Sequence, residues 1–230
     1  YAKQKPLIGY APTSSTIVPK SDNASDVEFA RKETFNIDRT GISCTAWWSD
    51  AIVLGQVCKG MEFLQKADMS KICKPLDFYA YNVYVSSNQD VADVDWNKKP
   101  GMPKTALEWE IMPSVMYWSA KFFYERYKLP LIISENGMAN IDFVMSDGKV
   151  HDPQRCEFIK LYLTQLKKAT DQGIPIDGYL YWSALDNFEW AIGYLARFGL
   201  IHVDFTTQKR TLKDSAYYYK QIIESNGEIL

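Results

Sequence analysis

A carboxylate stands where a short apolar strand gives way to a turn, in residues 131–137 (Leu-Ile-Ile-Ser-Glu-Asn-Gly). The first three residues are apolar and mostly β-branched, as in a strand that is buried on both faces. Asn136 and Gly137 tolerate the left-handed backbone conformations of tight turns. Glu135 is therefore predicted to project from the carboxyl end of a buried strand. In an α/β barrel this end is the rim that carries the active site.

A second segment, residues 178–190, brings aromatic rings and carboxylates together along the chain. It overlaps an apolar stretch, residues 174–181, that is predicted to form another strand. Carbohydrate sites combine flat apolar rings, which pack under sugar faces, with carboxylates that accept hydroxyl hydrogen bonds. The composition of this segment therefore indicates a sugar-binding loop.

The length and charge of the chain limit its class. Its 230 residues suit a single unit with one sizeable core, and hydrophobic (47%) and charged (23%) fractions are those of a globular protein. The formal charge of −2 gives no reason to expect a nucleic acid or a membrane as a partner. No apolar run reaches the roughly 20 residues that span a bilayer. The start lacks both an initiator Met and a signal-peptide core, which is typical of a processed or truncated product.

The four cysteines form no CxxC pair, whereas a zinc site needs closely spaced ligands. We therefore expect no metal site and interpret the cysteines as buried free thiols. Free thiols favour a reducing compartment, so the predicted location is the cytoplasm. These residues are Cys44, Cys58, Cys73 and Cys156.

Strand and helix patterns alternate along the chain in four units, the order typical of a parallel sheet covered by helices. An aromatic cluster at Trp47 and Trp48, interpreted as packing, and a polar loop over residues 86–105 interrupt the alternation. The predicted strands are residues 6–11, 76–84, 131–134 and 174–181, and the predicted helices begin near residue 25 and cover residues 113–127, 152–172 and 213–224.

The segments around Glu135 and Glu189 resemble the two signature motifs of the family 1 glycoside hydrolases, which are retaining β-glycosidases on a (β/α)8 barrel. Residues 77–84 (Asp-Phe-Tyr-Ala-Tyr-Asn-Val-Tyr) resemble a further strand motif, with Ala80 and Val83 as departures. Weaker similarity reaches residues 8–10. Downstream, the match continues through Gly193-Tyr194, residues 197–200 and 203–205, Arg210, Lys213 and Ser215-Ala216.

By this resemblance the four units are similar to the fifth to eighth units of the barrel. The predicted fold is thus α/β, a C-terminal half of a TIM barrel that takes up residues 1–230 as one unit. An eight-stranded barrel does not close with four strands. The half would leave two sheet edges and much of its barrel face uncovered. We therefore expect an N-terminal half-barrel as a partner, or self-association.

The resemblance also implies roles for residues near the predicted rim. Retaining glycosidases use two carboxyl groups about 5–5.5 Å apart, one as nucleophile and one as acid/base. Glu135 matches the nucleophile, although a surface turn glutamate is the alternative. Tyr84 matches the tyrosine that donates a hydrogen bond to the nucleophile, and Asn82 matches a residue near the acid/base. Ordinary strand packing is the alternative for both.

The downstream segment would bind the sugar. By resemblance, Glu189 and Trp190 bind the outer hydroxyl groups in the −1 subsite, Trp182 is the platform under the ring and Phe198 is a nearby aromatic wall. A carboxylate at Glu189 would repel a phosphate, which favours an unphosphorylated gluco- or galacto-type β-glycoside or oligosaccharide. Four neighbouring residues have other expected roles: Phe188 and Tyr194 in the core, and Asp186 and Asn187 in local side-chain to backbone bonds.

Arg197 could pair with a carboxylate near the site or hold the segment around Asp204, and the sequence leaves both open. The family's acid/base glutamate lies in an Asn-Glu-Pro motif, which does not occur in these 230 residues. The leading hypothesis is therefore a β-glucosidase half that is inactive alone, with no cofactor implied. The alternative is a non-catalytic half-barrel that binds sugar or a protein partner.

Overall fold

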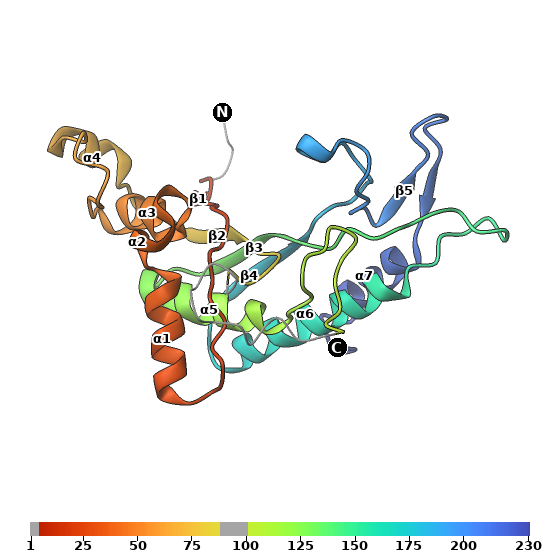
Figure 1. Ribbon diagram of the computed structural model, residues 1–230, viewed down its shortest axis with the longest axis horizontal. Coiled ribbons are helices and arrows are strands. Elements are labelled where there is room, and N and C mark those ends of the chain that lie inside the picture. The colour runs from red at the N-terminus through yellow and green to blue at the C-terminus, as the bar shows by residue number, and fades with distance from the viewer. Residues whose placement is uncertain (1–4, 88–100) are drawn as a thin grey trace.

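The protein, described by a computed structural model over residues 5–87 and 101–230, contains a sheet of parallel strands with helices along one face (Figure 1). The strands pair in sequence order as β1, β2, β3 and β4. This order confirms the four predicted strand–helix units. The strands are β1 (Gly9–Tyr10), β2 (Phe78–Asn82), β3 (Leu131–Asn136) and β4 (Ile176–Tyr181).

The helices predicted from the sequence are present within a few residues of their expected bounds, whereas α4 and an antiparallel hairpin, β5–β6, were not predicted. No helix in the described part of the chain is long and apolar enough to cross a membrane. The bounds are α1 (Ala24–Thr34), α2 (Ile37–Thr40), α3 (Thr45–Ser49), α4 (Lys66–Ile72), α5 (Ser114–Tyr127), α6 (Pro153–Asp171), α7 (Asp214–Glu224), β5 (Ile201–Val203) and β6 (Arg210–Leu212), with short helical turns at Gly41–Ser43, Asp50–Leu54 and Trp190–Ile192.

Local residues set the ends of the main helices. The Asn23 side chain accepts a hydrogen bond from the backbone N–H of Asp26 and so caps α1. Pro153 begins α6, where a missing N–H costs nothing. Gly173, at φ +82°, follows the last turn of α6 in a left-handed conformation that glycine adopts without strain. The chain then turns back directly into β4.

The core lies between the sheet and helices α5 and α6. Tyr79 and Tyr81 of β2 are fully buried, and their ring centroids lie 5.5 and 4.8 Å from that of Phe123 in α5. Successive side chains of a strand point to opposite faces. The other face of the sheet is less covered, and Leu180 of β4 is 58% exposed there. The expected uncovered barrel face is therefore present.

The first strand is shorter than predicted, and part of one predicted loop lies outside the described residues. The strand predicted over residues 6–11 is wrong in extent, because β1 covers only two residues. Pro6 has no N–H to donate and Leu7 is 74% exposed. Ile8 still bonds to the residue before β2, because Asp77 N donates to Ile8 O at 2.7 Å and the Asp77 side chain accepts from Ile8 N at 2.9 Å. Of the loop predicted over residues 86–105, residues 88–100 lie outside the described part of the chain.

Candidate active site

The predicted nucleophile lies at the carboxyl end of β3, next to a tyrosine that follows β2. Tyr84 Oη donates a hydrogen bond to Glu135 Oε2 at 2.7 Å. Burial, this hydrogen bond and the charge of Glu135 raise the pKa of the Tyr84 phenol well above its ordinary value. Tyr84 therefore stays protonated and acts as a donor to the carboxylate. This fixes the direction of the Glu135 side chain.

Asn82 lies opposite Glu135 in the parallel pair of β2 and β3, where the register shifts. Ser134 Oγ donates a hydrogen bond to Asn82 Oδ1 at 2.7 Å, and Val83 N donates to Glu135 O at 2.9 Å. Such irregularities are frequent beside active sites, since they redirect side chains. Here the shift brings Asn82, Tyr84 and Glu135 to one end of the sheet.

Asn136 and Gly137 do not have the left-handed backbone conformation for which the sequence analysis selected them. Asn136 is the last residue of β3, and its buried amide donates to Val83 O (2.7 Å) and accepts from Tyr179 Oη (2.9 Å). Gly137 does not have a positive φ. Instead, a Cβ atom at Gly137 would lie 1.9 Å from the carbonyl oxygen of Trp182. Glycine is needed because two backbones approach closely beside Glu135 and Trp182.

We predict that Gly137→Ala lowers the free energy of unfolding by about 1–3 kcal/mol, since the added methyl group forces a backbone shift. Gly178→Ala is the matched control, because its Cβ would meet only Ile132 at 3.6 Å, an ordinary contact. Urea unfolding monitored by circular dichroism measures both variants. Equal unfolding free energies for the two would contradict the close approach.

The sugar-binding residues predicted downstream of β4 lie in one loop. Trp182 Nε1 lies 3.4 Å from Glu189 Oε2, so the indole ring and the carboxylate are in contact. Trp182 is half-buried and packs in a cluster with Tyr84. Trp190 begins a short helical turn and is 82% exposed. The structure thus brings Trp182 and Glu189 together and leaves the Trp190 ring in solvent.

Two aromatic rings, those of Phe198 and Trp109, pack against the ring of Tyr84. Phe198 is 2% exposed, and its ring centroid lies 6.2 Å from that of Tyr84 and 6.0 Å from that of Trp109. The centroids of Tyr84 and Trp109 lie 5.6 Å apart. Phe198 is placed here as packing for Tyr84. Trp109 was not predicted, and its only signal in the sequence is a Trp between two glutamates, Glu108 and Glu110.

The expectation that Phe188 and Tyr194 are core residues is wrong, because they are 62% and 56% exposed. Their rings pack on each other, with centroids 5.4 Å apart, and Tyr194 also packs on Phe205 at 4.4 Å. The two rings therefore pack on each other within the loop, and not on the sheet.

A buried carboxylate anchors this loop to distant parts of the chain. The side chain of Asp186 accepts hydrogen bonds from Lys213 Nζ (2.9 Å), Arg197 Nη1 (2.5 Å), Gly199 N (2.9 Å) and Val203 N (3.3 Å). The expected local bonding of Asp186 is therefore wrong, since its partners lie 11 to 27 positions away. Arg197 also donates to Val203 O at 3.0 Å, so both of the roles left open for it occur together.

The hydrogen bonds of Asp186 belong to a larger network that also contains buried ion pairs. Lys213 Nζ also donates to Asp142 Oδ2 at 2.5 Å, and Arg155 bridges Asp142 and Asp152. Asp152 accepts hydrogen bonds from the N–H and hydroxyl of Ser215. Although burial opposes ionisation, Arg155 and Lys213 hold the pKa of Asp142 below its ordinary value. The network ties the loop of residues 182–190 to the amino ends of α6 and α7.

The two histidines lie in contrasting surroundings. His151 contacts Asp214 Oδ2 at 2.6 Å and Asp147 Oδ2 at 2.9 Å, and these hydrogen bonds raise its pKa. His202 in β5 is 7% exposed, and burial together with the charge of Arg197 lowers its pKa.

We therefore predict that the two imidazoles titrate on opposite sides of pH 6.5, the ordinary histidine value, with His151 above it. A raised pKa means that the folded chain binds the proton more tightly. The stabilisation by His151 is thus fully present below about pH 6.5 and lost as pH rises through the raised value. NMR titration of wild type and His151→Gln assigns the two curves. A titration of His151 below pH 6.5 would contradict the ion pairs.

Together, the four parallel βα units form one half of a (β/α)8 barrel, and the candidate site lies at its carboxyl rim. A sequence model of glycosyl hydrolase family 1 matches residues 1–228. The chain belongs to glycosyl hydrolase family 1.

Relatives of the chain include β-glucosidases. The chain is 45% identical to β-glucosidase A of Thermotoga maritima over 168 residues, which cover 70% of this chain and 37% of the relative. It is 35% identical to β-glucosidase A of Acetivibrio thermocellus over 241 residues, covering 96% of this chain and 52% of the relative. The solved family 1 β-glucosidase of T. maritima superposes with a TM-score of 0.78 at 35% identity, over 96% of this chain and 51% of that one. The chain thus spans about half the length of these proteins or less.

Proposed function

We propose that residues 1–230 form the C-terminal half of a retaining β-glycosidase, with strands 5 to 8 of its barrel. The observation that carries the proposal is the 2.7 Å hydrogen bond from Tyr84 to Glu135 at the carboxyl end of β3. A surface turn glutamate would need no half-buried phenol to orient it. Glu135 is assigned as the nucleophile that attacks the anomeric carbon and forms a glycosyl-enzyme intermediate.

The sugar would lie over Trp182, with Glu189 and Trp190 binding its outer hydroxyl groups. Asn82 would lie toward the acid/base side of the site. The T. maritima enzyme, 36% identical here, has been solved in complex with deoxynojirimycin, a sugar-like molecule. By analogy the substrate class is an unphosphorylated β-glucoside, because the Glu189 carboxylate repels a phosphate group.

The acid/base would come from an N-terminal half-barrel. A general acid contributes about 10²–10⁴-fold to such reactions, so this chain alone is expected to be nearly inactive on ordinary glycosides. The chemistry needs carboxylates and water and no cofactor. We also propose a cytoplasmic location, supported by the four free thiols, of which only Cys44 is fully buried.

The test is reconstitution. The probe is the half of the T. maritima β-glucosidase that this chain does not match, called the complementary half below. Each half alone should leave 4-nitrophenyl β-D-glucoside intact, whereas the mixture should release nitrophenolate. A stable complex of the two halves that releases none would contradict the proposal and favour a non-catalytic half-barrel.

A further inference from the structure

The side chain of Asn136, the last residue of β3, links the ends of three strands. It is fully buried, and its amide nitrogen donates a hydrogen bond at 2.7 Å to the backbone oxygen of Val83, which follows β2 and precedes Tyr84. The amide oxygen accepts a hydrogen bond from Tyr179 Oη of β4 at 2.9 Å. One side chain next to Glu135 therefore contacts both neighbouring strands.

Regular strand pairing does not reach the carboxyl ends of these strands. The pairing of β2 with β3 shifts register between Tyr81 and Asn82, and the pairing of β3 with β4 shifts between Ile133 and Asn136. Such shifts disrupt the ladder of backbone hydrogen bonds locally. The Asn136 amide supplies a hydrogen bond where the regular ladder ends. The position of the chain after β2 therefore depends on a side chain.

The hydrogen bond from Asn136 acts on the residue before Tyr84. Val83 N donates to Glu135 O at 2.9 Å, and Val83 O accepts from the Asn136 side chain. Both polar backbone groups of Val83 are thus held by consecutive residues of β3. Because Tyr84 follows directly, these two bonds fix the point from which its side chain reaches Glu135 Oε2.

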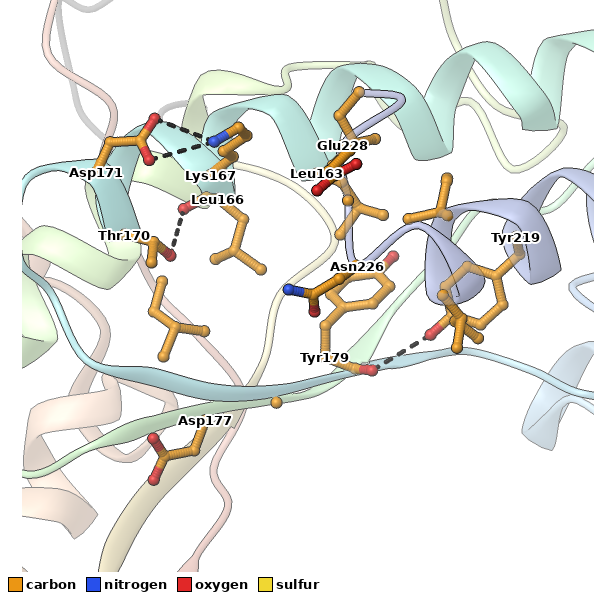
Figure 2. Close-up of a pocket in the computed structure, with 16 residues that line it drawn as sticks. Leu163, Leu166, Lys167, Thr170, Asp171, Asp177, Tyr179, Tyr219, Asn226 and Glu228 are labelled. Atoms are coloured by element: carbon orange, nitrogen blue, oxygen red, sulfur yellow. Dashed lines mark hydrogen bonds and ion pairs between the residues drawn. The ribbon is translucent and has the colours of Figure 1, made fainter.

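The Tyr179 hydroxyl sets the direction of the Asn136 amide. Figure 2 shows the Tyr179 ring on the helical side of β4, where Tyr219 Oη donates to the backbone carbonyl of Tyr179 at 3.3 Å. Burial raises the pKa of the Tyr179 phenol well above its ordinary value, so the hydroxyl keeps its proton and is a donor. The amide oxygen of Asn136 is its acceptor, and the amide nitrogen therefore points to Val83.

We propose that Asn136 is a positioning residue, oriented by Tyr179, that places Tyr84 for its hydrogen bond to Glu135. The inference rests on the proposed function, since it concerns the same nucleophile. The alternative is that the amide only satisfies buried backbone groups at the strand ends. A positioning residue acts on the reaction through Tyr84, whereas a residue that only stabilises the fold acts independently of Tyr84.

The test measures how fast 2,4-dinitrophenyl 2-deoxy-2-fluoro-β-D-glucoside labels the complex with the complementary half. The leaving group needs little acid assistance, so the labelling rate reports on the nucleophile. Asn136→Ala should slow labelling by about 10²-fold, the scale of a displacement of about 1 Å in a site. Tyr179→Phe should slow it by about tenfold, the scale of one hydrogen bond. The matched control, Tyr81→Phe, removes a buried hydroxyl bonded to Ser119 of α5 and should stay within about twofold of wild type.

A double-mutant cycle separates positioning from stabilisation. In a Tyr84→Phe background, Asn136→Ala should slow labelling by less than about tenfold, because the hydrogen bond that it disturbs is already absent. The same slowing in both backgrounds, or labelling of Asn136→Ala at the wild-type rate, would overturn the inference and leave Glu135 as the nucleophile. Absence of an adduct in the wild-type complex would instead contradict the proposed function, and the inference with it.

Tyr179→Phe keeps the test valid if Asn136→Ala does not fold, because it removes one hydroxyl and leaves the buried amide in place. The same cycle with Tyr84→Phe then applies. In the chain alone, the Val83 amide should exchange hydrogen faster in Tyr179→Phe than in wild type, since the end of β2 is held less tightly. The Tyr79 amide, at the amino end of β2, should exchange at the same rate in both. Equal exchange at Val83 in the two chains would overturn the role of Tyr179.

Discussion

In the reconstituted complex, Glu135→Ala is expected to lower kcat for 4-nitrophenyl β-D-glucoside by at least about 10⁴-fold, the scale reached when a covalent nucleophile is removed. The substitution removes the carboxylate that would form the bond to the anomeric carbon. Tyr84 Oη then loses its acceptor, at 2.7 Å in the wild type, but remains part of the aromatic cluster. Folding should therefore survive, which thermal unfolding of the variant checks.

Rescue by azide separates a nucleophile from a merely structural carboxylate. With the Glu135 side chain shortened, azide has room to attack the anomeric carbon from the same side, and nitrophenolate leaves with the bonding electron pair. The product would be the α-glucosyl azide, of inverted configuration. Restored nitrophenolate release together with this product is the expected result. A variant that keeps wild-type kcat would remove Glu135 from the mechanism.

Asp186→Ala is expected to destabilise the chain by about 3–5 kcal/mol, because it removes one of the two carboxylates that pair with buried Lys213 and leaves two backbone N–H groups without their acceptor. For a chain of this length the melting temperature should fall by about 6–20 °C, at about 2–4 °C per kcal/mol. The loop that carries Trp182 and Glu189 should lose hydrogen-exchange protection first. Circular dichroism and hydrogen exchange measure these effects.

The matched control is Asp171→Ala, which removes one member of the exposed Lys167–Asp171 pair. Exposed pairs contribute about 0–1 kcal/mol, so the control should change the melting temperature by no more than about 4 °C. A similar small effect of Asp186→Ala would mean that the buried network does not support the loop. A large effect confined to Asp186→Ala would support it.

The main strands and helices could be predicted because hydrophobic patterns and end signals agree along the chain. Helix α6 begins at Pro153 and is followed by Gly173, and β3 begins with a short apolar run. β1 was overestimated because the pattern does not show where pairing stops. The hairpin β5–β6 was missed because its strands have only three residues each.

The site could be predicted only where residues belong to extended motifs. Tyr84 and Glu135 lie 51 positions apart, and their contact follows from the resemblance and from parallel pairing of adjacent strands. The link of Asp142 to Lys213 spans 71 positions. Nothing in the local sequence says which buried charges will meet. Phe188 and Tyr194 were assigned to the core because aromatic rings are usually buried, and the sequence does not show that they cover each other.

The most direct test of the account is mass spectrometry of the complex after incubation with 2,4-dinitrophenyl 2-deoxy-2-fluoro-β-D-glucoside. Fluorine disfavours the oxocarbenium-like transition states of both steps, and the good leaving group restores the first, so the glycosyl-enzyme intermediate accumulates. We predict a single adduct on this chain, located at Glu135 by peptide mapping. An adduct on another residue, or none in a complex that hydrolyses the unfluorinated glucoside, would contradict the assignment of Glu135 as the nucleophile.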